Sequence, residues 1–276
     1  MAIITLTTDF GEKDYFVGAV KGRICTEMNA MTVVDISHRI SPFNIQEGAY
    51  ILKNTYKNFP EGTVHIIGID SERTPENRHL VMLLDGHYFI GADNGIFSLL
   101  ASDMRPERLA AIGIDDTPES SFPVLDVFVK AACHIARGGK PELLGKPVDS
   151  FKEIKALEPV VNAEKDKITG HVIYIDNYGN VVTNITRTLF EAVGKGRDFE
   201  LSARNYTFRS IYKRYSEAID FSVEKHRRQD DGKKMAIFNS GGHVELAIYK
   251  SNLDTVGGAA TLLGLDYRDT VTVQFG

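Results

Sequence analysis

Two spacings of apolar residues alternate along the first half of the chain. Residues 3–8, 32–36 and 63–70 are short runs rich in β-branched side chains, which is typical of buried strands. Residues 16–28 and 45–56 instead repeat apolar side chains at helical spacing, so each would present one apolar stripe. Strands that alternate with such helices predict a parallel sheet with crossover helices, which is the α/β class.

An antiparallel hairpin is predicted after this alternation. Residues 80–84 and 87–90 are apolar runs on either side of Asp85-Gly86, a pair that suits a type I′ turn. Residues 128–135 repeat apolar side chains at helical spacing, and Gly138-Gly139 follow them. This pattern predicts a helix that ends at the two glycines.

The second half of the chain has a different character. Residues 150–168 are charged and aperiodic, so we place a boundary there, between an N-terminal α/β domain (residues 1–155) and a smaller C-terminal domain (residues 169–276). Residues 213–233 are dense in charge and are expected to form an exposed excursion. Short strand-like runs predict a mostly β domain, either an open sheet or a barrel; they lie at 171–176, 181–185, 198–202, 235–239, 243–249 and 271–275.

The composition favours a small-molecule partner. The 276 residues are 43% hydrophobic, and the formal net charge of -5 offers no basic surface for nucleic acid or an anionic membrane. Neither a signal peptide nor a membrane span is recognisable, which favours a cytoplasmic protein. The eight histidines lack metal-site spacing, so no metal is expected. Cys25 and Cys133 lie in helical patterns and are expected to be buried small hydrophobes.

Two carboxylates follow predicted strands of the N-terminal half. In open α/β sheets the ligand lies beyond the carboxyl ends of the strands, so Asp9 and Asp70 could converge on one crevice. Taken singly, Asp9 could instead cap the next helix and Asp70 could begin a turn. Walker A and dinucleotide-binding sequences are absent, so the loop after Asp9 is not built for phosphate. A carboxylate there suits hydroxyl donors, such as a ribose diol, or a cationic centre.

Two turns of the C-terminal half are open to more than one interpretation. Residues 176–180 (DNYGN) and 239–243 (NSGGH) each connect two predicted strands. Turn chemistry alone explains both, because Asp, Asn and Gly favour such positions. Exposed backbone groups beside Ser240 could also grip a ligand.

Several motifs in order resemble one family. The chain is similar, nearly from end to end, to the S-adenosyl-L-methionine (SAM) hydroxide adenosyltransferases, formerly DUF62, which are related to the SAM-dependent fluorinase and chlorinase. The segments that carry this resemblance are TTDFGEKDYFVGAVKG (7–22), SPFNIQEGAYIL (41–52), HIIGID (65–70), ADNGIFS (92–98), DVFVKAACHIA (126–136), IDNYGNVVTNI (175–185) and NSGGHVELAI (239–248).

The resemblance implies a Rossmann-like N-terminal domain and a homotrimer. SAM would bind between the N-terminal domain of one subunit and the C-terminal domain of its neighbour. Phe10 and Asn94 lie inside matching motifs and are expected among the substrate-binding residues. The implied contacts are Asp9 with the ribose hydroxyls, Phe43 with the sugar and methionine, Asp176 with the methionine amino group, Tyr178 and Asn180 with the adenine end, and Ser240 with the methionine carboxylate.

The implied reaction is displacement at C5′ of SAM by water or hydroxide, which releases adenosine and L-methionine without a cofactor. In hydrolytic relatives an aspartate works on water with an arginine and a histidine. Asp70 matches the aspartate and Arg78 is the expected arginine, with Arg73 as the alternative. Pro123 occupies the usual histidine position, for which His79 could substitute.

Two other functions remain open from the sequence. A protein that binds SAM or adenosine without turnover would explain the absent histidine. Halide-dependent transfer is disfavoured, because Asp70 would repel a halide and Val124 replaces the small or hydroxylic residue expected to cradle it.

Overall fold

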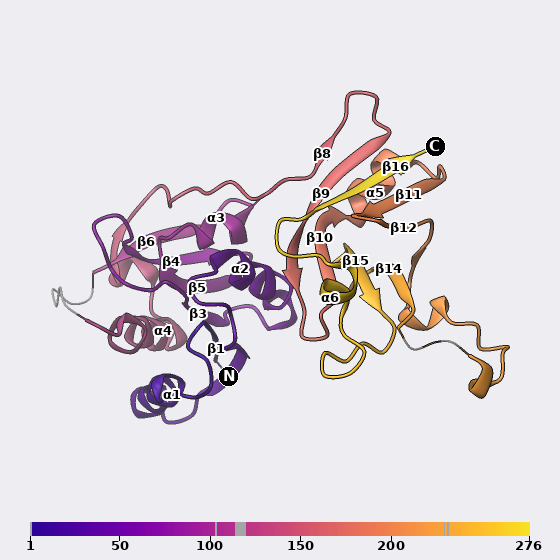
Figure 1. Ribbon diagram of the computed structural model, residues 1–276. Coiled ribbons are helices and arrows are strands. Elements are labelled where there is room, and N and C mark those ends of the chain that lie inside the picture. Colours follow the sequence, from indigo (N-terminus) through magenta and orange to yellow (C-terminus); the bar gives the residue numbers. More distant parts are fainter. Residues whose placement is uncertain (1, 103, 114–119, 229, 231) are drawn as a thin grey trace. The chain divides into compact units, whose positions relative to one another are not determined.

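The computed structural model describes residues 2–102, 104–113, 120–228, 230 and 232–276 (Figure 1). Contacts divide the chain into two compact units, Met1–Lys155 and Ala156–Gly276, which are called the N-terminal and C-terminal units below. The fold is therefore mixed α/β with two domains.

The N-terminal unit contains a seven-stranded sheet in the order β2-β1-β3-β5-β4-β6-β7. Neighbouring strands in the β2-β1-β3-β5 half pair in parallel, and the β5-β4, β4-β6 and β6-β7 pairs are antiparallel. The strands are β1 (Ile3–Thr8), β2 (Thr32–Ser37), β3 (Val64–Gly68), β4 (His79–Leu84), β5 (His87–Ala92), β6 (Arg108–Ile112) and β7 (Gly145–Pro147).

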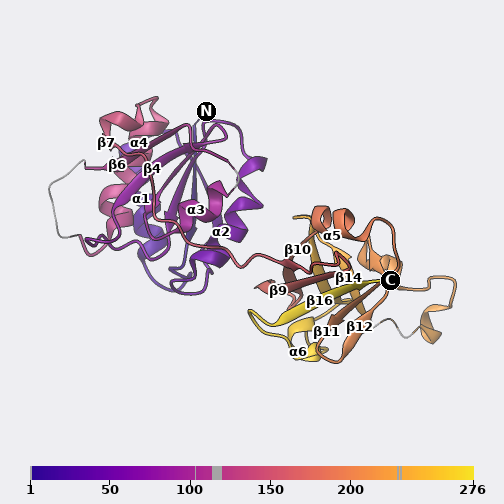
Figure 2. The same ribbon diagram turned by 90° about the horizontal axis from the view of Figure 1, so that it is seen from above.

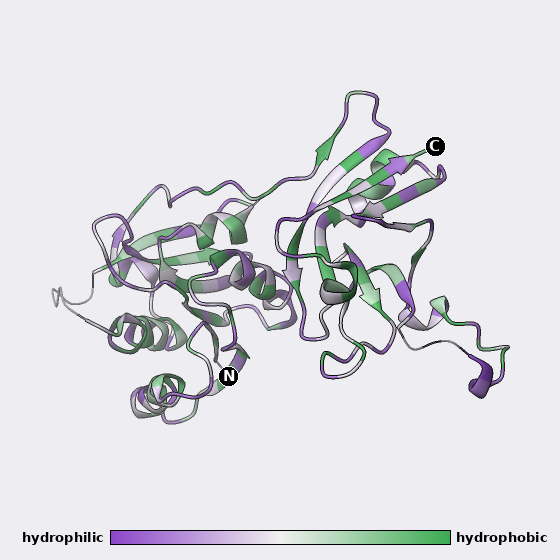
Figure 3. Cartoon of the chain, in the orientation of Figure 1, coloured by the Kyte–Doolittle hydropathy of each residue, from purple (hydrophilic) through white to green (hydrophobic). Residues whose placement is uncertain are grey.

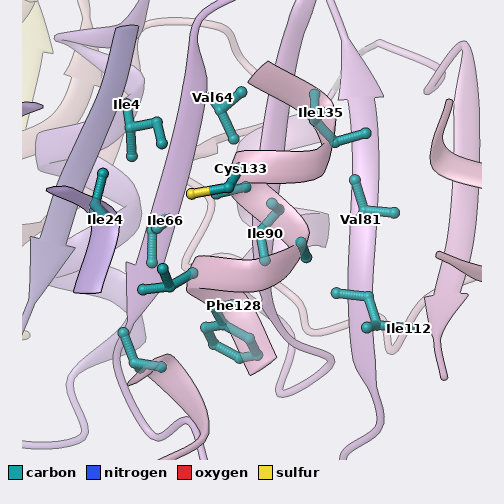
Figure 4. Packing of buried hydrophobic residues seen from close by; sticks show 14 of the residues in the cluster. Ile4, Ile24, Val64, Ile66, Val81, Ile90, Ile112, Phe128, Cys133 and Ile135 are labelled. Carbon is teal, nitrogen blue, oxygen red and sulfur yellow. The ribbon is translucent and has the colours of Figure 1, made fainter. Parts of the chain in front are cut away.

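Helices cover both faces of this sheet (Figure 1). On one face, α1 (Phe16–Glu27) and α4 (Val129–Ala136) pack on apolar side chains of the central strands, as the labelled residues in Figure 4 show. On the other face, α2 (Ile45–Lys53) and α3 (Ile96–Ala101) pack on a second cluster. Buried strands with apolar side chains on both faces are expected where helices cover both faces, which explains the continuous apolar runs.

The hairpin prediction is confirmed. β4 and β5 are antiparallel with Leu84 opposite His87, so Asp85-Gly86 form a two-residue loop. Both loop residues have positive φ, 53° for Asp85 and 74° for Gly86, as a type I′ turn requires.

Other boundaries and one burial differ from expectation. The helix predicted to reach residue 56 ends at Lys53, and Tyr56 lies in the 3₁₀ helix η1 (Tyr56–Asn58), where it is still buried. The prediction that Cys25 is buried was wrong: its side chain is exposed, whereas Cys133 is buried. Ile24 faces the sheet, and the next residue of a helix is rotated by about 100°, which turns Cys25 toward solvent.

The C-terminal unit is a mostly antiparallel nine-stranded sheet, in the order β12-β11-β16-β9-β10-β15-β14-β13, with β8 paired to β9. Figure 2 shows β12, β11, β16 and β9 side by side. The strands are β8 (Val160–Val161), β9 (Lys167–Ile175), β10 (Val181–Thr186), β11 (Phe199–Ala203), β12 (Tyr206–Phe208), β13 (Ile211–Tyr212), β14 (Lys234–Phe238), β15 (His243–Ile248) and β16 (Thr270–Phe275). The helices are α5 (Arg187–Gly194) and α6 (Ala259–Leu263).

The charged excursion is only partly exposed. Its first part contains the 3₁₀ helix η4 (Tyr215–Ala218), and Ala218 is buried with Met235, Ile237 and Ala247 of β14 and β15. Its outer part, around η5 (Lys225–Arg227), is exposed and strongly hydrophilic (Figure 3). The expectation of a wholly exposed segment therefore holds for the outer part alone.

Two features of the described residues bear on the class of function. No helix among them has both the length and the apolar character needed to cross a membrane. The same residues contain no group of three or more His, Cys, Asp or Glu side chains placed to hold a metal ion.

Candidate active site

A pocket of about 520 Å³ opens in the N-terminal unit, where β1 and β3 end. It is lined by acidic residues, phenylalanines and small polar or cyclic residues: Asp9, Asp70, Glu72, Phe10, Phe16, Phe43, Phe122, Pro42, Ser71, Ser120, Ser121 and Pro123. Thr8 pairs with Gly68 in the parallel register of β1 and β3, which brings the two following loops side by side. Asp9 and Asp70 therefore line one pocket, as the parallel-strand argument predicts.

The loop that carries Asp9 is fixed by hydrogen bonds on both sides. The hydroxyl of Thr8 lies 2.8 Å from Nδ1 of His38, and the amide of Gly11 donates to the carbonyl of the same histidine at 2.7 Å. Gly11 has a φ of +70°, which glycine adopts without steric cost. The Asp9 carboxylate accepts the backbone N–H of Phe43 at 2.9 Å. Asp9 is thereby held at the pocket wall and does not cap α1.

Asp70 lies on strained backbone. Its φ is +43°, and a non-glycine residue in this left-handed region is uncommon. Phe43, which faces the same pocket, has a φ of +62°. Such strain costs on the order of 1–3 kcal/mol per residue and persists only where the surroundings impose it, commonly at functional sites.

An aromatic wall stands beside the two carboxylates. The rings of Phe10, Phe16 and Phe122 are mutually 5.3 to 5.8 Å apart between centroids. Phe122 and Pro123 lead into a π-helical turn, η2 (Val124–Phe128), and π-turns are frequent at functional sites. The hydroxyl of Ser120 accepts from the Phe122 amide at 3.1 Å, which fixes the entry to this turn.

The charge of the pocket favours a cationic ligand. Asp9, Asp70 and Glu72 are its titratable lining groups, and none of the described lining residues is basic. Burial raises the pKa of Asp9 above its ordinary value, and the charge of Asp70 adds to this rise. The charge of a cationic ligand would oppose both effects by stabilising the ionised carboxylates. The cation would also interact favourably with the faces of the phenylalanine rings.

The structure does not bring Arg78 into this pocket. Its Nε donates to Asp93 at 3.0 Å, and its guanidinium also donates to the carbonyl of Ser150. Arg73 is exposed and is likewise not a lining residue. His79 is buried, lies 3.0 Å from the carbonyl of Ser71 through Nε2, and has its pKa lowered mainly by burial. Arg73 and Arg78 belong to the loop after Asp70 and His79 follows it, and none of the three lines the pocket.

Asn94 also lies outside the pocket lining. Its side chain is buried, and its amide nitrogen donates to the carbonyls of Ile69 and Asp70 at 3.0 and 3.2 Å. Its amide oxygen accepts from the backbone of Ile96 at 3.2 Å. All its hydrogen-bonding groups are thus used within the protein.

The C-terminal unit holds the other predicted residues in two turns. In the first, the Asp176 carboxylate accepts the amides of Tyr178 and Asn180, both at 2.8 Å, and the Asn180 side chain at 3.0 Å. Gly179 has a φ of +73° and lies against Gly258 so closely that a Cβ would clash. Tyr178 is left exposed and Asn180 is buried. The turn therefore presents a preorganised carboxylate beside an exposed aromatic ring.

Ser240 lies exposed in the second turn, between β14 and β15. Three residues into β15, the carboxylate of Glu245 is buried and accepts the hydroxyl of Tyr215 at 2.7 Å. Burial raises the pKa of Glu245, and the charge of Asp176 raises it further. Glu245 and Tyr215 are thus coupled to the Asp176 turn.

Sequence reasoning missed several of these residues. Glu72 and Ser120 carry no distinguishing pattern, because loop residues acquire a common wall only through the fold. Glu245 did carry a signal: it is a lone charge within the apolar strand sequence HVELAI, and buried charges are rare unless they are paired.

The fold and the pocket together define a class: a two-domain protein with a ligand pocket at the carboxyl edge of an α/β sheet. Within that class the chain belongs to the SAM hydroxide adenosyltransferase family. Residues 4–145 match the N-terminal domain of that family, and residues 170–272 match its C-terminal domain.

Individual relatives agree with the family match. The chain is 30% identical to a Methanocaldococcus jannaschii protein named (R)-S-adenosyl-L-methionine hydrolase, over 99% of this chain and 96% of the relative. It is 25% identical to a Nocardia brasiliensis protein named fluorinase, over 70% of this chain and 74% of that one. A solved Thermotoga maritima structure, of an uncharacterized conserved protein, has the same fold, with a TM-score of 0.82 at 24% identity over 99% of this chain and all of the other.

Proposed function

We propose that the protein hydrolyses S-adenosyl-L-methionine at C5′ and releases adenosine and L-methionine. The observation that carries this proposal is the acidic, phenylalanine-lined pocket in a chain of this family. A sulfonium compound is a cation with hydroxyl groups on its ribose, and the pocket offers carboxylates and aromatic faces to both features.

The proposed chemistry requires little besides position and a dry environment. Water attacks C5′, the C5′–S bond breaks with its electron pair retained on sulfur, and the water proton leaves to a base. The sulfonium is already an activated leaving group, so holding water in line with the C5′–S bond supplies most of what is needed. Asp9 would accept the ribose hydroxyls, and Asp70, at the strained end of β3, would orient water and accept its proton.

The charge of the pocket favours water over a halide ion as the nucleophile. Three carboxylates would repel an anion that approaches C5′, and no basic residue among the described lining groups would attract one. The fluorinase relatives keep halide transfer as a second candidate. A third candidate, binding without turnover, is favoured by one observation: Pro123 lines the pocket where a histidine is expected from the resemblance.

The finer features follow from the same proposal. The N-terminal domain would act as a Rossmann-like adenosyl-binding domain. Three subunits would assemble so that Asp176, Tyr178, Asn180 and Ser240 of one subunit complete the pocket of the next with contacts to methionine and adenine. Such an enzyme would work in the cytoplasm and need no metal or cofactor. Analytical ultracentrifugation tests the trimer separately from the chemistry.

Incubation of the purified protein with SAM, followed by chromatography for adenosine, tests the function. Parallel reactions with and without chloride or fluoride separate hydrolysis from halide transfer. Adenosine formed equally in both, with no 5′-halogenated product, supports hydrolysis. Retention of SAM without any product supports binding alone and rejects the proposal.

Two variants assign the roles of the carboxylates. Asp70→Asn is expected to bind SAM but lose turnover, whereas Glu76→Gln, on the same exposed loop and outside the pocket lining, should keep both. Wild-type turnover in the Asp70→Asn variant would show that another group activates water.

A further inference from the structure

The register of the N-terminal sheet places Asn94 opposite Asp70. β3 and β5 pair in parallel with Ile66 opposite Ile90, so four residues further along each chain, residue 70 lies across from residue 94. Both residues lie just beyond the ends of their strands, where the ladder of backbone bonds has stopped. Any hydrogen bond between the two loops at this point therefore has to involve a side chain.

Asn94 makes this contact with two hydrogen bonds. Its Nδ2 donates to the carbonyls of Ile69 and Asp70 at 3.0 and 3.2 Å, and its Oδ1 accepts from Ile96 at the start of α3. Two consecutive carbonyls held by one amide fix the two peptide planes that meet at the Cα of Asp70, which restricts the φ and ψ of Asp70. This is the residue whose φ is +43°.

The surroundings of Asn94 make this clamp rigid. Asp93 accepts both the Arg78 side chain at 3.0 Å and the backbone of Lys152 at 2.7 Å. Gly95 has a φ of +107° and packs against Ile154, where a Cβ would clash. Residues 93–95 are thus fixed before and after Asn94, so its amide cannot follow a movement of the Asp70 loop.

We propose that Asn94 is a positioning residue, which imposes the left-handed conformation of Asp70 and so aims its carboxylate at the reacting water. The proposal rests on the hydrolase function. Without the amide, Asp70 would relax toward an ordinary φ, and its carboxylate would move relative to C5′. Because Asn94 does not line the pocket, its loss should affect the chemical step far more than the affinity for the nucleoside.

The Asn94→Ala variant tests the proposal. We expect kcat to fall by about 10- to 100-fold, since a displacement of about 1 Å in a reacting group costs this much. The dissociation constant for adenosine should change by less than about twofold, because Asp9 and the phenylalanine wall are untouched. If Asn94→Ala does not remain folded, Asn94→Ser, which keeps a polar but shorter side chain, is used in its place.

Ser98→Ala is the matched control. Ser98 lies in α3, and its hydroxyl donates to Gly95 at 2.8 Å and accepts from Ile154 at 3.1 Å, so it stabilises the same region without touching Asp70. This variant should lower the melting temperature but keep kcat. Equal loss of kcat in both variants would mean that Asn94 acts through stability alone and would overturn the proposal.

A crystal structure of the Asn94 variant gives a readout that does not depend on activity. The φ of Asp70 is expected to leave the left-handed region. An unchanged φ, or an unchanged kcat in an active enzyme, rejects the positioning role. If the wild-type protein forms no adenosine, the hydrolase proposal fails by itself, and the conformation of Asp70 still decides whether Asn94 imposes it.

Discussion

The hydroxyl of Tyr215 donates to Oε1 of Glu245 at 2.7 Å and so joins the excursion to the sheet of the C-terminal unit. Glu245 alternates with Val244 and Leu246, which are core residues, so its side chain lies on the opposite face of β15. Ala247 shares that face and packs with Ala218 of η4. The excursion thus covers a face that holds one buried carboxylate.

Removal of this hydroxyl should loosen the excursion. Tyr215→Phe leaves the Glu245 carboxylate buried with one donor fewer, and we expect a loss of about 1–3 kcal/mol in the free energy of unfolding. The pKa of Glu245, already raised by burial, should rise further, because the Tyr215 bond lowers it. Denaturant unfolding measures the loss of stability. Limited proteolysis within residues 213–233 shows whether the segment has become more open.

Tyr212→Phe is the matched control for this variant, since Tyr212 packs in the same small cluster. The sign of the pH effect also distinguishes the two. A carboxyl whose pKa is raised by folding binds its proton more tightly when folded, so stability falls as pH rises from the unfolded value of 4.5 through the folded value. This fall should extend to higher pH in Tyr215→Phe and stay unchanged in Tyr212→Phe.

Arg78 should prove to be a stabilising residue. Asp93 is buried, and Arg78→Ala removes the charged partner of its carboxylate, which keeps the hydrogen bond from the backbone N–H of Lys152. We expect a loss of about 1–3 kcal/mol of unfolding free energy with kcat reduced by less than about threefold. Arg73→Ala, at an exposed position of the same loop, should change stability by less than about 0.5 kcal/mol. A stable Arg78→Ala variant without turnover would instead assign this arginine to catalysis.

Asp9 is expected to strengthen ligand binding and to lower the stability of the fold. Asp9→Asn and Asp9→Ala are expected to weaken SAM and adenosine together, because both ligands carry the same ribose hydroxyls. Burial raises the pKa of Asp9, so its charge opposes folding at pH values above 3.8, and Asp9→Asn should melt at a higher temperature than the wild type at neutral pH. Calorimetric titration with adenosine and thermal unfolding measure the two effects. Undiminished affinity for either ligand contradicts the ribose assignment.

The period of apolar residues predicted the central strands and the first helices because long, buried elements repeat their pattern several times. The hairpin was predictable from Asp85-Gly86, whose positive φ values few other residue pairs tolerate. α3 has six residues and α6 has five, which is fewer than two helical turns, so no period could identify them. The exposure of Cys25 depended on the rotation of α1 against the sheet, which a residue pattern defines only to within about one position.

The site was predictable to the extent that it follows from strand ends. Asp9 and Asp70 could be placed at one sheet edge because each ends a parallel strand. The role of Asn94 required the register of β3 against β5, which no local pattern encodes. Arg78 bonds to Asp93, a residue across a hairpin, so a motif match alone could not identify the partner of its guanidinium, and its catalytic role stays a prediction. The roles of Asp176, Tyr178, Asn180 and Ser240 stay predictions.

Two buried histidines should make the N-terminal unit sensitive to acid. Nδ1 of His65 lies 2.7 Å from the Thr5 hydroxyl, and its Nε2 lies 3.2 Å from Nδ1 of His87. Burial, and then the charge of His87, lowers the pKa of His65 from 6.5 to about 3, and burial also lowers the pKa of His87. Above pH 6.5 both are neutral in either state, and stability is complete. Below it the unfolded chain takes up protons that the folded chain refuses, so stability falls between pH 6.5 and 3.

The slope of this fall is the measurable quantity. One histidine contributes about 1.4 kcal/mol per pH unit within the window, and His65→Gln, which can still bond to Thr5, should remove that share of the slope. His226→Gln, at an exposed position of the C-terminal unit, should leave it unchanged. Urea unfolding from pH 4.5 to 7.5 compares the three proteins. Equal slopes for wild type and His65→Gln would mean that His65 accepts a proton in the folded state, and the buried Thr5–His65–His87 chain would then have to open below pH 6.5.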